Sequence, residues 1–125
     1  MENRRIIMII DDDSTSLTMG KTILEQTYTV YPIPSGERFF KILTKVIPDL
    51  VLLDIEMPEM SGIEVLRRLK EDSHTQKIPV IIVSSINNPE NKQEALQLGA
   101  ADILVKPYSP PTLLQCIEKN IIKSV

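Results

Sequence analysis

The sequence is poor in several residue types, and each shortage excludes a class of protein. Cys116 is the only cysteine, so no disulfide can form within the chain, and a reducing compartment is expected. Aromatic residues make up 4% of the chain and tryptophan is absent, which leaves no aromatic platform for nucleic acid. Basic residues (14) are fewer than acidic residues (17), and the net charge of −3 argues against direct binding to nucleic acid.

Long apolar runs are also missing, since no stretch approaches the ~20 residues that a membrane-spanning helix needs. The first ten residues lack the pattern of a cleavable signal, so we expect a soluble, cytoplasmic protein that has no membrane partner. What is present is close to the globular average: 125 residues, of which 42% are hydrophobic and 25% are charged. This length and composition predict one domain over residues 1–125.

Segments of strand length alternate with segments of helical periodicity along the whole chain. Apolar runs predict strands at residues 4–10, 28–33, 49–54, 78–85 and 101–107. The spacing of apolar residues predicts helices that begin near Ser14, Ser35, Gly62, Pro89 and Ser109. We expect the first helix to take its N-cap from Ser14–Ser16 and to run to about Gln26, and the second to end at Pro48.

The second expected strand, YTVYPI (28–33), contains Pro32, which cannot donate a hydrogen bond to a neighbouring strand. We therefore place this strand at an edge of the sheet. Strands that alternate with helices predict a parallel sheet covered on both faces by right-handed crossovers. The natural fold is a doubly wound, flavodoxin-like (βα)5 three-layer sandwich with a five-stranded parallel sheet in the order 2-1-3-4-5.

Polar side chains follow four of the five expected strands, where the carboxyl ends of parallel strands meet and ligands bind. In chain order they are Asp11-Asp12-Asp13, Asp54, Ser84-Ser85 and Lys106. Two carboxylates about 4 Å apart repel by roughly 4 kcal/mol at an effective dielectric of about 20, so the acidic cluster needs a cation. Oxygen ligands favour Mg²⁺ (or Mn²⁺), and the absence of an imidazole or thiol beside them argues against zinc.

Five segments together resemble the receiver domain of two-component response regulators, the family that includes the single-domain chemotaxis regulators. They are IIDDDS (9–14), PDLVLLDIEMPEMSGIEVL (48–66), PVIIVSS (79–85), LGAAD (98–102) and LVKP (104–107). The aspartate followed by x-x-M-P-x-M-x-G is the most specific of these motifs. The resemblance covers essentially all 125 residues.

The resemblance implies a role for each polar residue at the strand ends. Asp54 matches the phosphoacceptor, Ser84 the conserved Ser/Thr, and Lys106 the invariant lysine. Asp11 and Asp12 match the acidic pair that holds Mg²⁺, with Asp54 as a further ligand. The implied reaction transfers a phosphoryl group onto Asp54 as an acyl phosphate, and the protein is then a signalling switch that slowly dephosphorylates itself rather than a metabolic enzyme.

Other positions carry narrower expectations from the family. Glu56 stands where a backbone carbonyl is lent to the metal, and Asp13 falls on a variable position, where we expect a solvated turn residue. Glu56 and Ile86 lie two residues beyond the phosphoacceptor and the hydroxyl, and these positions tune the lifetime of the phosphoryl group. The peptide bond that joins Lys106 to Pro107 is usually cis in the family.

The resemblance also implies partners. The phosphodonor is a sensor histidine kinase or a phosphotransfer protein, and the sequence does not identify the output protein. The family's usual output surface, on the fourth helix, the fifth strand and the fifth helix, would here carry Asn87, Asn88, Glu90, Lys92 and Gln97. We expect a monomer or a phosphorylation-dependent dimer, which is either a complete single-domain regulator or a part of a longer protein.

The sequence leaves three other interpretations open. A receiver-like interaction module would bind partners without being phosphorylated, although such modules usually lack one of the acids, the hydroxyl or the lysine. A small aspartate-nucleophile phosphohydrolase would use Glu56 as a general acid, but the Met57-Pro58 that follows and the lack of a cap insertion argue against it. A nucleotide-binding protein is disfavoured, because neither G-x-G-x-x-G nor a P-loop occurs.

One position on the fifth expected strand departs from the pattern of the family. Many receivers have an aromatic residue three positions before the lysine that moves with the hydroxyl, and this position is Ile103 here. We therefore expect coupling to run through Ser84 and backbone motion of residues 84–90. Ile103→Ala should leave both phosphoryl transfer and the phosphorylation-dependent change in partner affinity intact in a binding titration. Loss of the affinity change alone would contradict this hypothesis.

Overall fold

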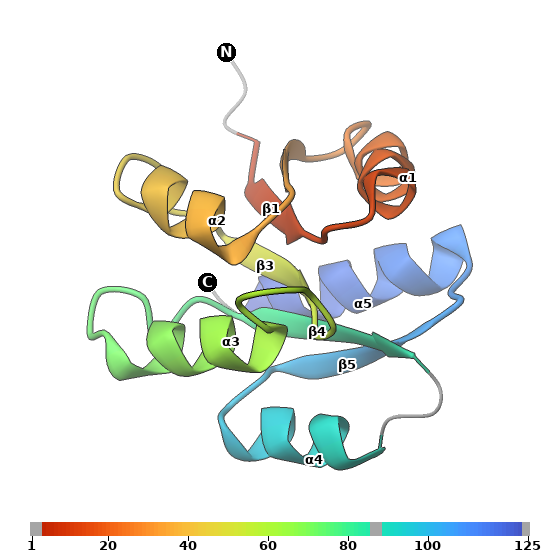
Figure 1. Cartoon of the computed structure of the whole chain (residues 1–125). Helices are drawn as coiled ribbons and strands as arrows, with labels where there is room; N and C mark the ends of the chain where they lie inside the picture. The colour runs from red at the N-terminus through yellow and green to blue at the C-terminus, as the bar shows by residue number, and fades with distance from the viewer. Residues whose placement is uncertain (1–3, 86–88, 124–125) are drawn as a thin grey trace.

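Strands and helices alternate along the chain, as Figure 1 shows. The structure is a computed structural model that describes residues 4–85 and 89–123. The strands are β1 (Ile6–Ile10), β2 (Thr29–Ile33), β3 (Leu50–Asp54), β4 (Val80–Ser85) and β5 (Asp102–Lys106). The helices are α1 (Ser14–Leu24), α2 (Gly36–Leu43), α3 (Gly62–Glu71), α4 (Pro89–Gln97) and α5 (Pro110–Lys123).

The five strands form one parallel sheet in the order β2-β1-β3-β4-β5. Strand β2 lies at an edge, where Pro32 is exposed and pairs in register with Ile9 of β1. A proline is tolerated at an edge because its missing N–H breaks no inner row of hydrogen bonds. The predicted strand order and the edge position of Pro32 are both confirmed.

Helices cover both faces of the sheet (Figure 1). Successive residues of a strand point to opposite faces, so the apolar strands form one hydrophobic core on each face. In β1, the buried side chains of Met8 and Ile10 belong to the core beneath α2, α3 and α4. Ile7 and Ile9 belong to the second core, beneath α1 and α5. The same alternation in β3 and β4 explains why these segments are apolar throughout, and it confirms the three-layer sandwich.

The start of α1 corrects one prediction. The N-cap is Asp13, whose side chain accepts hydrogen bonds from the N–H groups of Thr15 and Ser16, and the helix begins at Ser14. The expected N-cap within Ser14–Ser16 was therefore wrong. Asp13, which was expected to be a solvated turn residue, is exposed and serves as the cap. Aspartate and serine are comparable N-caps, so the local sequence did not separate them.

The end of α2 also differs from the prediction. The N-cap is Ser35, as expected, but the helix ends at Leu43 and does not continue to Pro48. The N–H groups of Lys45 and Val46 both donate to the carbonyl of Ile42, so a tight turn ends the helix before the proline is reached.

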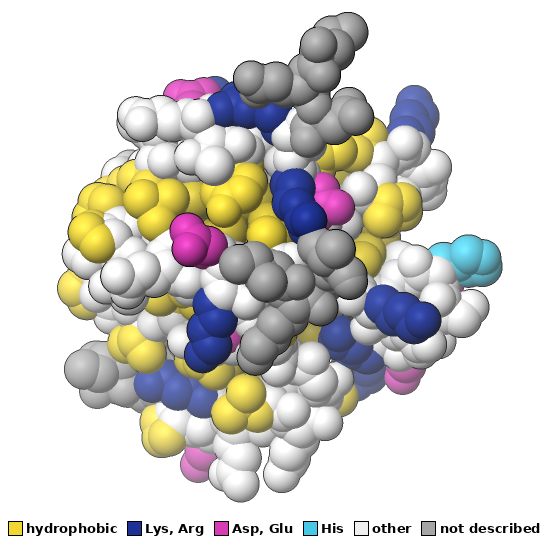
Figure 2. Space-filling view, turned by 180° about the vertical axis from the view of Figure 1, so that it is seen from behind, with side chains coloured by type: hydrophobic (Ala, Val, Ile, Leu, Met, Phe, Trp, Pro, Cys, Tyr) yellow, Lys and Arg dark blue, Asp and Glu magenta, His cyan; other side chains and the backbone are white. Residues whose placement is uncertain are grey.

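Figure 2 shows the opposite side of the molecule, where hydrophobic side chains gather in a band on the side covered by α1 and α5. Leu17, Tyr28 and Cys116 are partly buried residues that pack against the core there. Among the described residues, no helix combines the length and the apolar character that crossing a bilayer requires.

Gly62, the first residue of α3, brings the chain back against the end of β3. A Cβ at this position would lie 2.3 Å from the carbonyl oxygen of Asp54 and 2.7 Å from the Cα of Ile55. Both neighbours are backbone atoms that cannot move away without distorting β3. The N–H of Gly62 also donates to the carbonyl of Ile55 at 3.0 Å, so the close approach is part of the loop's hydrogen bonding.

Gly62→Ala is therefore expected to lower the free energy of unfolding by about 3 kcal/mol, because an added methyl group overpacks a rigid site. Gly20→Ala is the matched control, since a Cβ there would meet only the end of the Ile9 side chain at 3.0 Å. Its contact cost is offset by about 1 kcal/mol of helix propensity, so its net change should be small. Urea unfolding measures both, and equal destabilisation would contradict this account.

Candidate functional site

The carboxyl ends of the strands bring the predicted site residues to one rim of the sheet. Asp11 and Asp12 follow β1, and Asp54 is the last residue of β3. One carboxylate oxygen from each of the three lies within 4.8 Å of the others. Asp11 and Asp54 are buried, at 5% and 8% exposure, whereas Asp12 is exposed to solvent. The acidic cluster is thus open on one side.

Lys106, the last residue of β5, completes the cluster. Its Nζ donates a hydrogen bond to Oδ2 of Asp11 at 3.1 Å and lies 3.7 Å from Oδ1 of Asp54. Burial alone would lower the pKa of Lys106, but the neighbouring Asp54 and Asp11 outweigh burial and raise this pKa. The lysine therefore remains a cation. When all groups are ionised, three carboxylates face one ammonium group and leave an excess of two negative charges.

Asp54 has the most perturbed acidity of the rim. Burial is the main cause, and the nearby Asp11 is the second; together they raise the pKa of Asp54 from its ordinary 3.8 to about 7. Lys106 and the backbone N–H of Glu56 lower the pKa of Asp54 but do not outweigh these two effects. A cation placed among the three acids would favour the ionised form of Asp54.

Asp13, by contrast, points its side chain into the first turn of α1. Its Oδ2 accepts from the hydroxyl of Ser16 at 2.8 Å, and this bond is the largest cause that lowers the pKa of Asp13. The N–H of Asp13 donates to Oδ1 of Asp11 at 3.0 Å, which helps to fix the orientation of the Asp11 carboxylate. Asp13 is not among the three acids whose oxygens gather, and its role is to hold the loop after β1.

The acidic cluster fits a hard divalent cation. It supplies carboxylate oxygens within a small volume, an excess of negative charge, and an exposed member through which water can complete the coordination. Carboxylate oxygens and water are the ligands that Mg²⁺ prefers. The cluster of Asp11, Asp12 and Asp54 can therefore hold a metal ion. A contact between the metal and the backbone carbonyl of Glu56 stays a prediction.

The two serines at the end of β4 form hydrogen bonds with each other and with the loop after β3. The hydroxyl of Ser84, which is fully buried, donates to the backbone carbonyl of Ser85 at 3.2 Å. The hydroxyl of Ser85 in turn donates to Oε1 of Glu56 at 3.2 Å. The sequence places Ser84 and Ser85 at the rim but does not reveal the contact between Ser85 and Glu56, because it joins segments 29 residues apart. Ile86, which was expected beside the site, lies outside the described residues.

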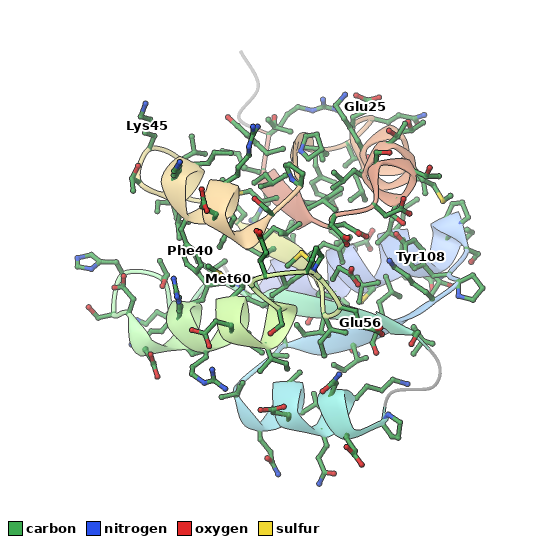
Figure 3. The ribbon with its side chains drawn as sticks, in the orientation of Figure 1. Glu25, Phe40, Lys45, Glu56, Met60 and Tyr108 are labelled. Atoms are coloured by element: carbon green, nitrogen blue, oxygen red, sulfur yellow. The ribbon has the colours of Figure 1, made fainter. Side chains whose placement is uncertain are left out.

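Lys106 is followed by a cis peptide bond to Pro107, as the resemblance implied, and then by Tyr108. Figure 3 shows that Tyr108 and Glu56 both lie at the carboxyl end of the sheet. Ile103 is partly buried and packs against the core beneath α2, α3 and α4. The position that is often aromatic in the family thus contributes apolar packing in this protein.

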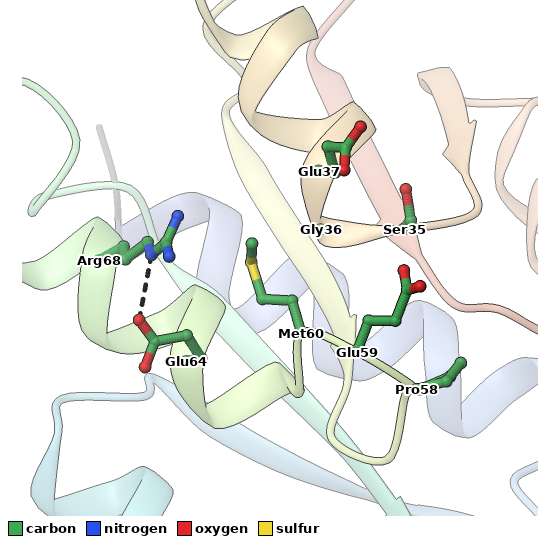
Figure 4. Close-up of a pocket in the computed structure, with 8 residues that line it drawn as sticks. All are labelled: Ser35, Gly36, Glu37, Pro58, Glu59, Met60, Glu64 and Arg68. Atoms are coloured by element: carbon green, nitrogen blue, oxygen red, sulfur yellow. Dashed lines mark hydrogen bonds and ion pairs between the residues drawn. The ribbon is translucent and has the colours of Figure 1, made fainter.

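A separate pocket lies between the start of α2 and the loop before α3, as Figure 4 shows. It is lined by Ser35, Gly36, Glu37, Pro58, Glu59, Met60, Glu64 and Arg68. The side chain of Arg68 donates to Glu64 at 3.0 Å along one turn of α3. None of the three clustered acids lines this pocket.

Comparisons with known proteins match nearly the whole chain. The family described as "Response regulator receiver domain" matches residues 7–118. A probable cyclic di-GMP phosphodiesterase of Vibrio cholerae is 43% identical over 115 residues, which cover 92% of this chain and 26% of that protein. The two-component response regulator ORR3 of Oryza sativa subsp. japonica is 31% identical over 119 residues, which cover 94% of this chain and 91% of that protein.

A solved structure supports the same likeness. The chemotaxis protein CheY4 of Vibrio cholerae matches with a TM-score of 0.89 and 27% identity, over 94% of this chain and 99% of that one. Several curated relatives are much longer than the matched region: the chain spans 26%, 18% and 48% of the lengths of three of them.

The raised pKa of Asp54 predicts how stability depends on pH in metal-free buffer. Because this pKa is about 7 in the folded protein and 3.8 ordinarily, folding takes up a proton between these values. The contribution of Asp54 therefore makes the free energy of unfolding fall as the pH rises through this window. At pH values above it, Asp54→Asn should stabilise the protein by on the order of 2 kcal/mol.

Urea unfolding in the presence of a chelator measures this effect, and Glu71→Gln, which changes an exposed acid at the end of α3, is the control. The control should follow the wild-type pH dependence. If Asp54→Asn were no more stable than the control above neutral pH, the crowding of charge at the rim would be refuted.

Proposed function

The chain belongs to the response regulator receiver family, and on that premise we propose that Asp54 accepts a phosphoryl group from a histidine kinase or a phosphotransfer protein. The observation that carries this proposal is the position of Asp54, buried at the end of β3 among Asp11, Asp12 and Lys106. A carboxylate in this setting is a nucleophile with a cation beside it and an open side from which a phosphoryl group can approach.

The chemistry assigned to the side chains is phosphoryl transfer. An oxygen of Asp54 forms a bond to phosphorus while the bond from phosphorus to the donor breaks, which gives an acyl phosphate. Lys106, with its Nζ 3.7 Å from Oδ1 of Asp54, is placed to offset the charge of a phosphoryl oxygen. Ser84 can donate to another phosphoryl oxygen once its hydroxyl leaves the carbonyl of Ser85.

Asp11, Asp12 and Asp54, with the backbone carbonyl of Glu56, would hold a Mg²⁺ or Mn²⁺ ion in this proposal. When bound, the ion offsets the negative charge of the carboxylates and of the phosphoryl oxygens. The hydrogen bond from Asp13 N–H keeps the Asp11 carboxylate turned toward the rim, so the metal-binding oxygens are oriented in advance.

The proposed output is a change in a surface that binds a partner. Ser84 lies near the end of β4, so a move of its hydroxyl toward Asp54 would displace the end of this strand, and α4 is the next helix along the chain. We place the affected surface on α4, β5 and α5, with Glu90, Lys92 and Gln97 among its residues; Asn87 and Asn88 lie outside the described residues. Residues 1–125 would act as one receiver domain, either as a monomer or as a dimer that forms on phosphorylation.

The proposal predicts that acetyl phosphate and Mg²⁺ add the mass of one phosphoryl group to the intact protein, and that Asp54→Asn abolishes the gain. Lys106→Met should slow the gain by about tenfold or more, because a charge that acts on the phosphoryl oxygens is lost. Asp49→Asn is the matched control: this acid lies at the opposite end of β3, where it accepts from Ile6 N–H at 2.7 Å, and it should label like the wild type.

Intact-mass spectrometry over time measures the added mass in all four proteins, the wild type and the three variants. Labelling of Asp54→Asn at the wild-type rate would refute the assignment of the phosphoacceptor. A wild-type protein that takes up no phosphoryl group would favour an interaction module, and steady turnover of a simple phosphate ester would favour a phosphohydrolase.

A further inference from the structure

Two successive hydrogen bonds connect the loop after β3 to the buried hydroxyl of Ser84. Glu56 Oε1 accepts from the hydroxyl of Ser85, and the carbonyl of Ser85 accepts from the hydroxyl of Ser84, both at 3.2 Å. Glu56 lies two residues after Asp54, whose carboxylate faces the backbone N–H of Glu56. The carboxylate of Glu56 therefore fixes the residue whose backbone holds the Ser84 hydroxyl.

The position of Ser85 in the sheet connects this contact to the strand that carries Lys106. Ser85 is paired in register with Lys106 of β5, one step beyond the pairing of Ser84 with Val105. On its other side, β4 contacts the loop after β3. The N–H of Ile55 donates to the carbonyl of Val83, and two residues further along β4 the hydroxyl of Ser85 donates to Glu56. Ser85 thus lies between the loop that carries Glu56 and the strand that carries Lys106.

The Ser84 hydroxyl has a single proton to donate. In the described arrangement it donates this proton to the Ser85 carbonyl, so it must leave that carbonyl before it can donate to a phosphoryl oxygen on Asp54. Any contact that fixes the Ser85 carbonyl favours the resting arrangement. A hydrogen bond from Ser85 to a carboxylate is such a contact, and bonds to charged acceptors are stronger than bonds between neutral groups.

We propose that Glu56 and Ser85 form a latch that holds Ser84 in its resting position and opposes the switch to the phosphorylated arrangement. The inference rests on the proposed role of Asp54 as the phosphoacceptor. Glu56 and Ser85 are positioning residues in this scheme, since they act on the phosphoryl group through Ser84. By linkage, a contact made only in the resting state weakens the binding of any ligand that needs the other state.

A double-mutant cycle tests the latch. The measured quantity is the affinity for beryllofluoride, a stable stand-in for the phosphoryl group, in the presence of Mg²⁺, followed by NMR of ¹⁵N-labelled protein. The four proteins are the wild type, Ser85→Ala, Glu56→Ala and the double variant. Ser85→Ala should tighten beryllofluoride binding by about fivefold, the effect of one exposed hydrogen bond to a charged group. In the Glu56→Ala background the same substitution should change the affinity by less than about twofold.

Ser85→Thr is the conservative control, because it keeps the hydroxyl and should bind beryllofluoride like the wild type. An equal change on Ser85→Ala in both backgrounds would show that Ser85 acts without Glu56 and would overturn the latch. No change in either background would overturn it as well.

A failure of the proposed role of Asp54 can be distinguished from a failure of the latch. If the wild type neither bound beryllofluoride nor took up a phosphoryl group, the role of Asp54 would be refuted, and the latch would be judged by amide hydrogen exchange in the unmodified protein. Ser85→Ala should then speed the exchange of the Ser84 and Ser85 amides by about fivefold, while Ser85→Thr should not. Unchanged exchange in Ser85→Ala would overturn the latch.

Discussion

Three carboxylates, those of Asp11, Asp12 and Asp54, are gathered at one rim of the sheet, and the ammonium group of Lys106 lies beside two of them. Asp11 and Asp54 are both buried, and Lys106 lies within 4 Å of each of them. Burial and the charge of Asp11 raise the pKa of Asp54 to about 7, so the lysine offsets the repulsion only in part. A rim with this excess of negative charge is stabilised by a cation, and a phosphoryl group can be attached there only if positive charge meets it.

The sheet holds these groups together against their repulsion. Strands β1 and β3 are neighbours whose last paired residues, Ile10 and Leu53, are fully buried in the apolar core. Gly62 then lets the loop after β3 return within contact distance of the Asp54 carbonyl, which keeps the loop close to the carboxylate. The stability that comes from burying the apolar strands thus balances an unfavourable charge cluster, as is common where strained groups serve a function.

Much of this arrangement could be predicted from the sequence because it follows from general rules of strand pairing. The edge position of β2 follows from one proline, Pro32, and the gathering of Asp54 with Asp11 follows from the ends of parallel strands. The contacts of individual side chains could not be predicted. The bond between Ser85 and Glu56 joins different segments, and the choice of Asp13 as N-cap depended on how the loop after β1 turns.

Burial and crowding, rather than an ordinary solvated environment, set the acidity of Asp54. Carbon-detected NMR of the metal-free protein, with the carboxyl carbons followed across pH and Asp54→Asn used for assignment, measures this directly. If burial and Asp11 act together on Asp54, its titration midpoint should be about 7. A midpoint close to the ordinary 3.8 would show instead that Asp54 is solvated and that the three acids do not crowd one another.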